Sequence, residues 1–499
     1  MNFNFSNINL FRLSLAVSLV LLVAAVFYSC DKVVSVSPPD KPPPKGYIFI
    51  ASYPKGFHIY LEGKARRRAT PDSITWLKTN TYSVTLKKDL FRDTSFSVDV
   101  VEGEKHSVFV DFSKNPAMLG SISCVTNPAG SDIFLNDSAT GLKTPTVISG
   151  LLPGYYNIRY HAQNHRDDSS LVTVRSSNQS IAKLTLVDTT IWKDYTTRTS
   201  LIPSDNLTCL TVDQNNVMWI GTDGQGLIKY DGNQWKLYNT LNSELKDLHI
   251  NCISIDNNGV KWIGTDGGLV QMIGEYMFVF NQRTSDLNDT HIEAITFDDI
   301  GNTWVGTKYS GLYKTYIDRH DGVRYWVISD SASGDMPENW ITTLVAQGGR
   351  VIWVGLKKSG IASNSGIGWS YYTRFKSGLP TDNIGASAVD DKGTVWFGHN
   401  SGNLNAGGLT YFDGTAFQTV YILPAFNSVY SLFMDRNNVK WIGTEKGVYK
   451  VAGQTASDIF NYDNTGLDLS NVRGIYQDKN GFIWFATNGG GLIKYKIVQ

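Results

Sequence analysis

Short runs in which apolar and polar residues alternate recur along most of the chain. Examples are HIYLEG and YSVTLKK in its first part, and CISID and GLIKY further on. Alternation with a period of two predicts strands that bury one face, and runs of this length are too short for most helices. Glycine, proline, asparagine and aspartate gather between the runs, as expected for tight turns. The pattern therefore predicts an all-β chain.

Two segments in the first part of the chain carry the same landmarks. Each landmark in the first segment has a partner in the second, 74 residues later. The pairs are Pro54 with Pro128, Gly56 with Gly130, and Thr70-Pro71 with Thr144-Pro145. One offset that fits three features indicates an internal repeat. We predict two small β-domains, residues 46–114 and 115–187.

These landmarks give the two segments a resemblance to PEGA domains. They are the P-x-G and T-P pairs, and in the second segment the L-x-P-G-Y motif at Leu151–Tyr155. The resemblance covers roughly residues 48–187. It implies small β-sandwich modules of bacterial surface proteins that act as spacers or in adhesion, with no catalytic residues to transfer.

The rest of the chain repeats a phrase of the type W-I-G-T, followed by glycine. Its tryptophans are Trp219, Trp262, Trp304, Trp353, Trp396, Trp441 and Trp484, spaced by 42 to 49 residues. Each period contains four short strand patterns. Such a period is the signature of a β-propeller, and seven phrases predict seven blades over residues 188–499.

A second series of aromatic residues marks the fourth, outer strand of each blade. It consists of Trp192, Trp235, Phe278, Trp326, Trp369, Phe417 and Phe460. The series starts before the first complete repeat, and no outer strand follows Tyr495. We therefore predict that the strand around Trp192 completes the last blade, which closes the ring and removes two free sheet edges.

The recurrent phrase resembles the repeats of two-component regulator propellers. The resemblance covers about residues 190–499. It implies a propeller of the kind found in the sensory region of hybrid histidine kinases and in free-standing secreted proteins. The sequence ends after the closing strand, without a kinase or receiver, so we expect no phosphorylation activity.

The N-terminus has the features of an export signal. Arg12 precedes an apolar run, Leu13–Tyr28, which Ser29 and Cys30 follow. The run is short for a membrane span, and a small residue before a cysteine resembles a lipoprotein lipobox. We expect a signal peptide over residues 1–29, lipidation of Cys30, and a proline-rich tether over residues 30–45. An ordinary signal peptide or a membrane anchor is the alternative.

Charge and cysteine content exclude several classes of function. Lys+Arg and Asp+Glu both number 45, so no basic excess favours binding to nucleic acid or to an anionic membrane surface. Three cysteines remain in the mature chain, an odd number that rules out complete pairing. We expect Cys124, Cys209 and Cys252 to be small buried residues.

The repeated polar residues are best explained by structure. The Asp-Asn-Asn-Gly turn at Asp256–Gly259 lacks the closing glutamate of a calcium loop, and aspartate and glycine suit hairpin turns. The glycine-rich loops lack the Gly-Lys-Ser/Thr of a phosphate loop. Glycines such as Gly264 are expected to let neighbouring blades pack closely, and the repeated tryptophans are expected to form the inter-blade core.

Ligand binding is expected where the repeats differ, in loops that share one face of the ring. The residues selected as binding residues are Lys308, Tyr309, Trp340, Lys357, His399 and Glu445. The same face carries Asp223, Gln225, His249, Asp266, Asn339, Lys358, Asn400, Asn403, Lys446 and Asn488. This mixed polar ring favours a carbohydrate, a peptide or a partner protein, and it contains no tight histidine cluster for a metal.

These features favour a non-catalytic, lipid-anchored binding protein of the bacterial cell envelope, with no cofactor. An accessory sensor for a separate transmembrane histidine kinase is one alternative. A propeller lyase or hydrolase acting on a glycan or cyclic peptide is another, with His399 and Glu445 as a base–acid pair.

Overall fold

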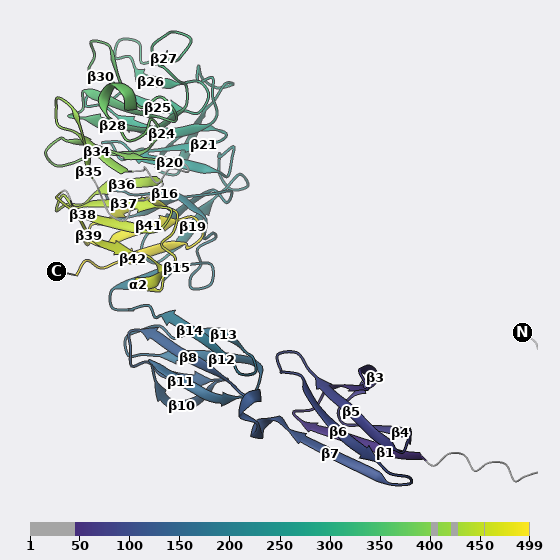
Figure 1. Ribbon diagram of the computed structural model, residues 1–499. Helices are drawn as coiled ribbons and strands as arrows, with labels where there is room; N and C mark the ends of the chain where they lie inside the picture. The colour runs from purple at the N-terminus through teal and green to yellow at the C-terminus, as the bar shows by residue number, and fades with distance from the viewer. Residues whose placement is uncertain (1–44, 401–407, 421–427, 454, 499) are drawn as a thin grey trace, which may run out of the picture. The chain divides into compact units, whose positions relative to one another are not determined.

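The computed structural model describes residues 45–400, 408–420, 428–453 and 455–498. Nearly all regular structure in these ranges is β-strand, as predicted (Figure 1). The helical segments are η1 (Phe112–Lys114), η2 (Pro116–Met118), α1 (Arg374–Ser377) and α2 (Tyr462–Thr465). None of the described helices has the length and apolar character needed to cross a membrane.

The first domain is a sandwich of a three-stranded and a four-stranded sheet, in the orders β4-β1-β7 and β3-β2-β5-β6. Burial alternates along β1, with Ile48 and Ile50 fully buried, because successive side chains point to opposite faces. Phe57 stacks on Phe112 in the core, with ring centroids 4.1 Å apart. The strands are β1 (Lys45–Tyr53), β2 (His58–Leu61), β3 (Lys64–Ala69), β4 (Asp72–Lys78), β5 (Asn80–Lys87), β6 (Thr94–Val100) and β7 (Lys105–Asp111).

The second domain repeats this topology, with the orders β11-β8-β14 and β10-β9-β12-β13. The shared Thr-Pro landmark has the same role in both domains. The Thr70 hydroxyl lies 2.6 Å from that of Ser52, and the Thr144 hydroxyl 2.5 Å from that of Thr126. The strands are β8 (Gly120–Asn127), β9 (Asp132–Leu135), β10 (Ser138–Lys143), β11 (Thr146–Leu151), β12 (Gly154–His161), β13 (Asp168–Val174) and β14 (Gln179–Thr185).

The remaining strands form seven four-stranded antiparallel sheets. Six of these sheets are continuous in sequence, and the last one takes its outer strand from β15. The first strands of successive sheets contact one another, and β40 contacts β16, so the described strands form a closed propeller with these strands around its centre.

The strand bounds follow the predicted repeat. The first three sheets contain β16 (Leu207–Val212), β17 (Met218–Thr222), β18 (Leu227–Tyr230) and β19 (Trp235–Tyr238); β20 (Ile250–Ile255), β21 (Lys261–Thr265), β22 (Gly268–Ile273) and β23 (Tyr276–Phe280); and β24 (Ile292–Phe297), β25 (Thr303–Thr307), β26 (Leu312–Ile317) and β27 (Arg324–Ser329). The fourth and fifth contain β28 (Ile341–Gln347), β29 (Val351–Leu356), β30 (Ile361–Asn364) and β31 (Trp369–Tyr372); and β32 (Ile384–Val389), β33 (Val395–His399), β34 (Gly408–Phe412) and β35 (Phe417–Val420). The last two contain β36 (Val429–Met434), β37 (Lys440–Thr444), β38 (Val448–Ala452) and β39 (Thr455–Phe460); and β40 (Val472–Gln477), β41 (Ile483–Thr487), β42 (Leu492–Tyr495) and β15 (Trp192–Tyr195).

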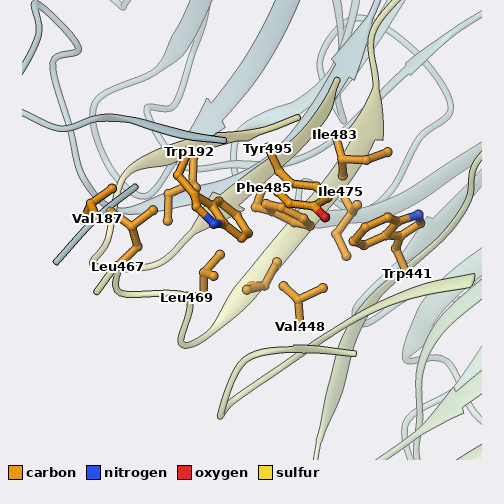
Figure 2. Close-up of a cluster of buried hydrophobic side chains, with 12 residues drawn as sticks. Val187, Trp192, Trp441, Val448, Leu467, Leu469, Ile475, Ile483, Phe485 and Tyr495 are labelled. Carbon is orange, nitrogen blue, oxygen red and sulfur yellow. The ribbon is translucent and has the colours of Figure 1, made fainter. Parts of the chain in front are cut away.

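The predicted closing strand is confirmed. Strand β15 pairs antiparallel with β42, and Trp192 lies opposite Tyr495 in the register. Trp192 is 7% exposed and belongs to a buried cluster with Trp441, Phe485 and Tyr495, drawn in Figure 2. Residues from the two ends of the propeller sequence thus share one hydrophobic core, which ties the first strand to the last sheet.

The repeated aspartates have the structural role predicted for them. In the first sheet, Asp213 Oδ1 accepts hydrogen bonds from the amides of Asn215 and Val217, and its Oδ2 accepts one from Trp219 Nε1. The bond from tryptophan to the residue six positions earlier recurs in all seven sheets, at 2.8 to 3.3 Å. In the fourth sheet the acceptor is Gln347 instead of aspartate. The carboxylate thus fixes the turn and the core tryptophan together.

Close packing between sheets explains the mid-strand glycines. A Cβ atom on Gly264 would lie 2.5 Å from Cys252 Sγ and 2.8 Å from Ile292 Cγ2 of the next sheet. Six of the seven repeated tryptophans are buried, as predicted, and Trp304 is half-buried. All three described cysteines are free; Cys124 is buried, whereas Cys209 and Cys252 are half-buried, so the prediction of burial was too strong for these two.

Candidate ligand site at the channel mouth

One end of the propeller collects the loops in which the repeats differ. In an antiparallel four-stranded sheet, the connections after the second and fourth strands lie at the same end. Backbone hydrogen bonds join these connections: Lys308 N donates to the carbonyl of His291, and Lys357 N donates to that of Trp340. We call this end of the ring the channel mouth. It lies opposite the end that carries the Asp-Trp turns.

Four of the six selected residues lie together there. Trp340 is half-buried in the connection before β28. The Lys308 ammonium lies 5.1 Å from the centroid of the Trp340 ring, and that of Lys357 lies 5.2 Å from it. Lys308 Nζ is also 5.3 Å from the ring of Tyr309, which is 57% exposed. Two cations and two aromatic rings from neighbouring sheets thus form one surface, the Trp340 cluster.

Hydrogen bonds hold the backbone beneath this cluster, two of them to a buried aspartate. Asp289, which is 4% exposed, accepts hydrogen bonds from the amides of Tyr309 (2.7 Å) and His291 (3.0 Å). Asn339 Nδ2 donates to the Tyr309 carbonyl at 3.0 Å. The loops that present the aromatic rings are therefore preorganised, which lowers the entropic cost of binding.

Glu293 was not among the binding residues predicted from the loop sequences. It is the second residue of β24. Glu293 is half-buried, and burial raises the pKa of its carboxyl group, although Lys308, His291 and Lys357 act to lower it. An acidic group therefore belongs to the electrostatic environment of the two lysines. His291 packs edge-on against Tyr309, with ring centroids 5.0 Å apart.

A signal for Glu293 is present in the sequence. In each sheet the pairing of the first strand with the second shifts register next to this position. The residues at this position around the ring are Thr208, Asn251, Glu293, Thr342, Gly385, Tyr430 and Arg473. This variation lies within strands, so a search restricted to loops passed over it. The Arg473 guanidinium lies 3.7 Å from the centroid of the Tyr430 ring.

The structure does not place His399 at the channel mouth. Its side chain is 0% exposed and occupies a position where five other sheets have a buried threonine. His399 Nδ1 lies 3.1 Å from the Thr381 carbonyl oxygen, and Nε2 lies 2.8 Å from Thr410 Oγ1. Burial lowers the His399 pKa to about 4. The ring is a neutral structural group, and we remove it from the candidate site.

Glu445 contacts the residue that precedes β36. Its Oε2 atom accepts a hydrogen bond from the Ser428 amide at 2.8 Å. Asn400 acts similarly, because its Oδ1 accepts from the Val429 amide at 2.8 Å. These contacts give both side chains a structural role at the junction of the fifth and sixth sheets.

The other residues of the predicted ring include one group with metal-ligand chemistry. Asp247, His249 and Asp266 offer atoms within 4.8 Å of one another, the one such group found among the described residues. His249 Nδ1 lies 2.9 Å from Asp247, and this hydrogen bond raises the His249 pKa. Hydrogen bonding between Asp247 and His249 accounts for the proximity of these two side chains. Asn403 and Cys30 lie outside the described residues.

Comparisons with known families agree with the architecture. Residues 45–116 and 119–190 match the model described as PEGA domain, and residues 201–224 and 466–489 match the one described as two component regulator propeller. None of the curated proteins compared with this chain matches it significantly.

Three solved structures have a similar fold. The extracellular domain of BT3049 from B. thetaiotaomicron, described as a hybrid two component system, gives a TM-score of 0.50 at 19% identity, covering 61% of this chain and 42% of that chain. The extracellular domain of BT4673 from B. thetaiotaomicron, also described as a hybrid two component system, gives 0.49 at 19% identity, with coverages of 62% and 40%. Virginiamycin B lyase from Staphylococcus aureus gives 0.49 at 14% identity, with coverages of 62% and 99%.

These structural matches bear on the fold alone. All three sequence identities are below 20%. This chain spans less than half the length of the two matched chains from B. thetaiotaomicron. The family matches identify the domains: the chain contains two PEGA domains followed by a propeller with two-component regulator propeller repeats.

Proposed function

We propose that the chain is a non-catalytic binding protein that takes a polar ligand at the channel mouth. The observation that carries the proposal is the placement of the Trp340 ring about 5 Å from both the Lys308 and the Lys357 ammonium groups. These residues interrupt the repeat, so the core of the sheets does not require them. Aromatic rings beside cations suit stacking on a sugar or an aromatic side chain while the charge fixes orientation.

The chemistry of the cluster narrows the ligand to a glycan, a peptide or a protein segment. Lys308 and Lys357 would donate hydrogen bonds to hydroxyl or carboxylate oxygens, since an ammonium has only donors. Glu293 would accept a hydrogen bond from a hydroxyl or amine that reaches further into the channel. Tyr309, which is mostly exposed, would supply contact area at a small entropic cost.

We place this protein outside the cytoplasm, attached by a lipid on Cys30. The lipobox-like sequence before Cys30 and the match to extracellular domains of sensor systems support this location. The two PEGA domains would then act as spacers between the anchor and the propeller. The Cys30 prediction rests on sequence alone.

A second candidate function is that of an accessory sensor for a separate transmembrane kinase. The two-component regulator repeats at residues 201–224 and 466–489 favour it. Capture of a kinase by the ligand-bound protein, and not by the ligand-free protein, would support the sensor function. Binding of the ligand without any kinase partner would support the simpler binding function.

His399 was the candidate base for a lyase or hydrolase function, and its position makes that role unsuitable. The His399 ring is fully buried and has hydrogen-bonding partners at both nitrogens. Turnover of a glycan or cyclic peptide would revive an enzymatic function and would require a different set of catalytic residues.

The experiment is a glycan and peptide array probed with the full-length protein and the Trp340→Ala variant. Loss of a specific signal in that variant would support the site. Trp76→Ala is a matched control, because Trp76 is 74% exposed in the first domain, outside the propeller. If Trp340→Ala keeps every signal of the parent, the proposed site is wrong.

A further inference from the structure

The outer hairpin of the third sheet is longer than those of several other sheets. Strands β26 and β27 form six residue pairs, from Leu312 with Ser329 to Ile317 with Arg324. The corresponding hairpins of the first, fourth and fifth sheets form four pairs each. This connection follows a third strand, so it projects at the end of the Asp-Trp turns, opposite the channel mouth.

A cavity of about 650 Å³ lies between this hairpin and the turns of the second and third sheets. Ligand pockets commonly measure about 300–1,000 Å³, so this cavity has room for a molecule the size of a disaccharide. The lining is mostly polar and charged. It includes Asp256, Asn258, Gln271, Arg319, His320 and Arg324.

Arg324 is a cation without a counter-ion in the part of the chain that the structure describes. Its guanidinium carbon lies 5.3 Å from the ring centroid of Trp262 and 5.2 Å from that of Phe280. Among the described residues its guanidinium makes one hydrogen bond, a long contact of 3.4 Å from Nη1 to Thr315 Oγ1. Burial lowers the pKa of Arg324, which reflects the cost of keeping this charge away from water.

Donors of the protein already bond to both carboxylate oxygens of Asp256 and to one of Asp318. Asp256 Oδ1 accepts hydrogen bonds from the amides of Asn258 and Val260. Its Oδ2 accepts one from the indole N–H of Trp262. Asp318 Oδ1 accepts the His320 amide. Arg319 and Arg324 supply the cationic donors of the lining, and the Arg324 guanidinium has no ion pair among the described residues.

We propose that this cavity is a second ligand site, specific for a small acidic saccharide. The guanidinium of Arg324 would take the carboxylate or sulfate group, because its planar fork matches such anions. The amide side chains of Asn258 and Gln271 line the same cavity and would hydrogen-bond ring hydroxyls. The site is independent of the Trp340 cluster, since the two occupy opposite ends of the sheets.

The test is calorimetric titration of the full-length protein with three disaccharides. One carries a uronic-acid carboxylate, one carries a sulfate without a carboxylate, and one is the neutral counterpart. We expect one of the two acidic probes, or both, to bind, and the neutral probe to bind at least about tenfold more weakly. Equal binding of all three would overturn the proposal, as would binding of an acidic dipeptide in place of the saccharides.

Variants locate the site. Arg324→Gln should weaken binding of the acidic probe by about tenfold or more, while Arg283→Gln, a change at an exposed arginine outside the cavity lining, should leave it unchanged. Trp340→Ala should also leave it unchanged, and loss of binding in that variant would place the ligand at the channel mouth instead. If the Arg324→Gln variant does not fold, the same titration is carried out on Gln271→Ala and Arg319→Gln. Unchanged affinity for the acidic probe in both of these variants would contradict the proposed site.

Discussion

The indole Nε1 of Trp396 donates a 2.9 Å hydrogen bond to Oδ2 of Asp390, six residues earlier in the chain. The other carboxylate oxygen of Asp390, Oδ1, accepts hydrogen bonds from the backbone amides of Lys392 and Thr394. One carboxylate therefore closes the turn between two strands and orients a buried tryptophan of the inter-blade core. Because equivalent contacts recur around the ring, each turn contributes to both local and tertiary structure.

Replacing Asp390 with alanine should destabilise the propeller. The change leaves two amides and a largely buried indole N–H without their acceptor, so we expect a loss of about 2–3 kcal/mol in the free energy of unfolding. Chemical denaturation measures this. Asp391→Ala is the matched control, because Asp391 is exposed in the same turn. Equal effects of the two changes would show that the Asp390 contacts contribute nothing specific.

Stability should fall in acid through the Asp390 carboxylate. Burial acts to raise the Asp390 pKa, but hydrogen bonds from Trp396, Thr394 and Lys392 bring it below its ordinary value of 3.8. A folded pKa below the unfolded one stabilises the protein at higher pH, and that stabilisation is lost as the pH falls through the folded pKa. Melting temperatures from pH 7 down to about pH 2.5 should drop below roughly pH 4, less steeply in Asp390→Asn. An identical pH profile for Asp390→Asn would refute this.

The propeller should depend on its closing strand. Deleting residues 188–197 removes β15 and exposes the edge of β42, so we expect aggregation or a large fall in melting temperature. Trp192→Ala should cost about 3–5 kcal/mol through its cavity, whereas Lys193→Ala, at an exposed position of the same strand, should cost little. A deletion variant that melts like the parent would show that the ring closes elsewhere.

Trp340 and Trp262 should have different roles, the first in ligand binding and the second in stability. Trp340→Ala should weaken ligand binding by about 1–3 kcal/mol with little effect on folding. Trp262→Ala should cost about 3–5 kcal/mol of stability, since Trp262 is 2% exposed in an inter-sheet core. Denaturation and titration of both variants provide the check. If Trp340→Ala unfolds the protein but the residual folded fraction keeps its affinity, the channel-mouth site is assigned wrongly.

Cys30→Ala should abolish lipidation. Without the thiol, no lipid can be attached, so we expect an unprocessed or released protein in place of a membrane-associated one. Gel mobility and membrane fractionation measure this. Unchanged size and fractionation would contradict the lipoprotein prediction.

The sequence by itself determined the architecture. Short alternating runs, the offset of 74 residues and the recurrent tryptophans are local or periodic signals, and each repeat folds into the same unit. The phase difference between the first series of tryptophans and the outer aromatic residues was sufficient to predict that β15 pairs with β42. The turn aspartates were also interpreted correctly, because turn chemistry depends on neighbours in the chain.

Only the tertiary structure decided which variable residues are exposed and which are buried. His399 differs from its counterparts in other repeats, yet its ring is inside the sheet, where Thr410 and the Thr381 carbonyl satisfy it. Glu293 is within a strand but belongs to the surroundings of the two lysines, and Arg324 lines a cavity formed by an elongated hairpin. Side-chain direction and burial arise from contacts between sheets distant in sequence, so a repeat pattern shows where residues vary but not where they point.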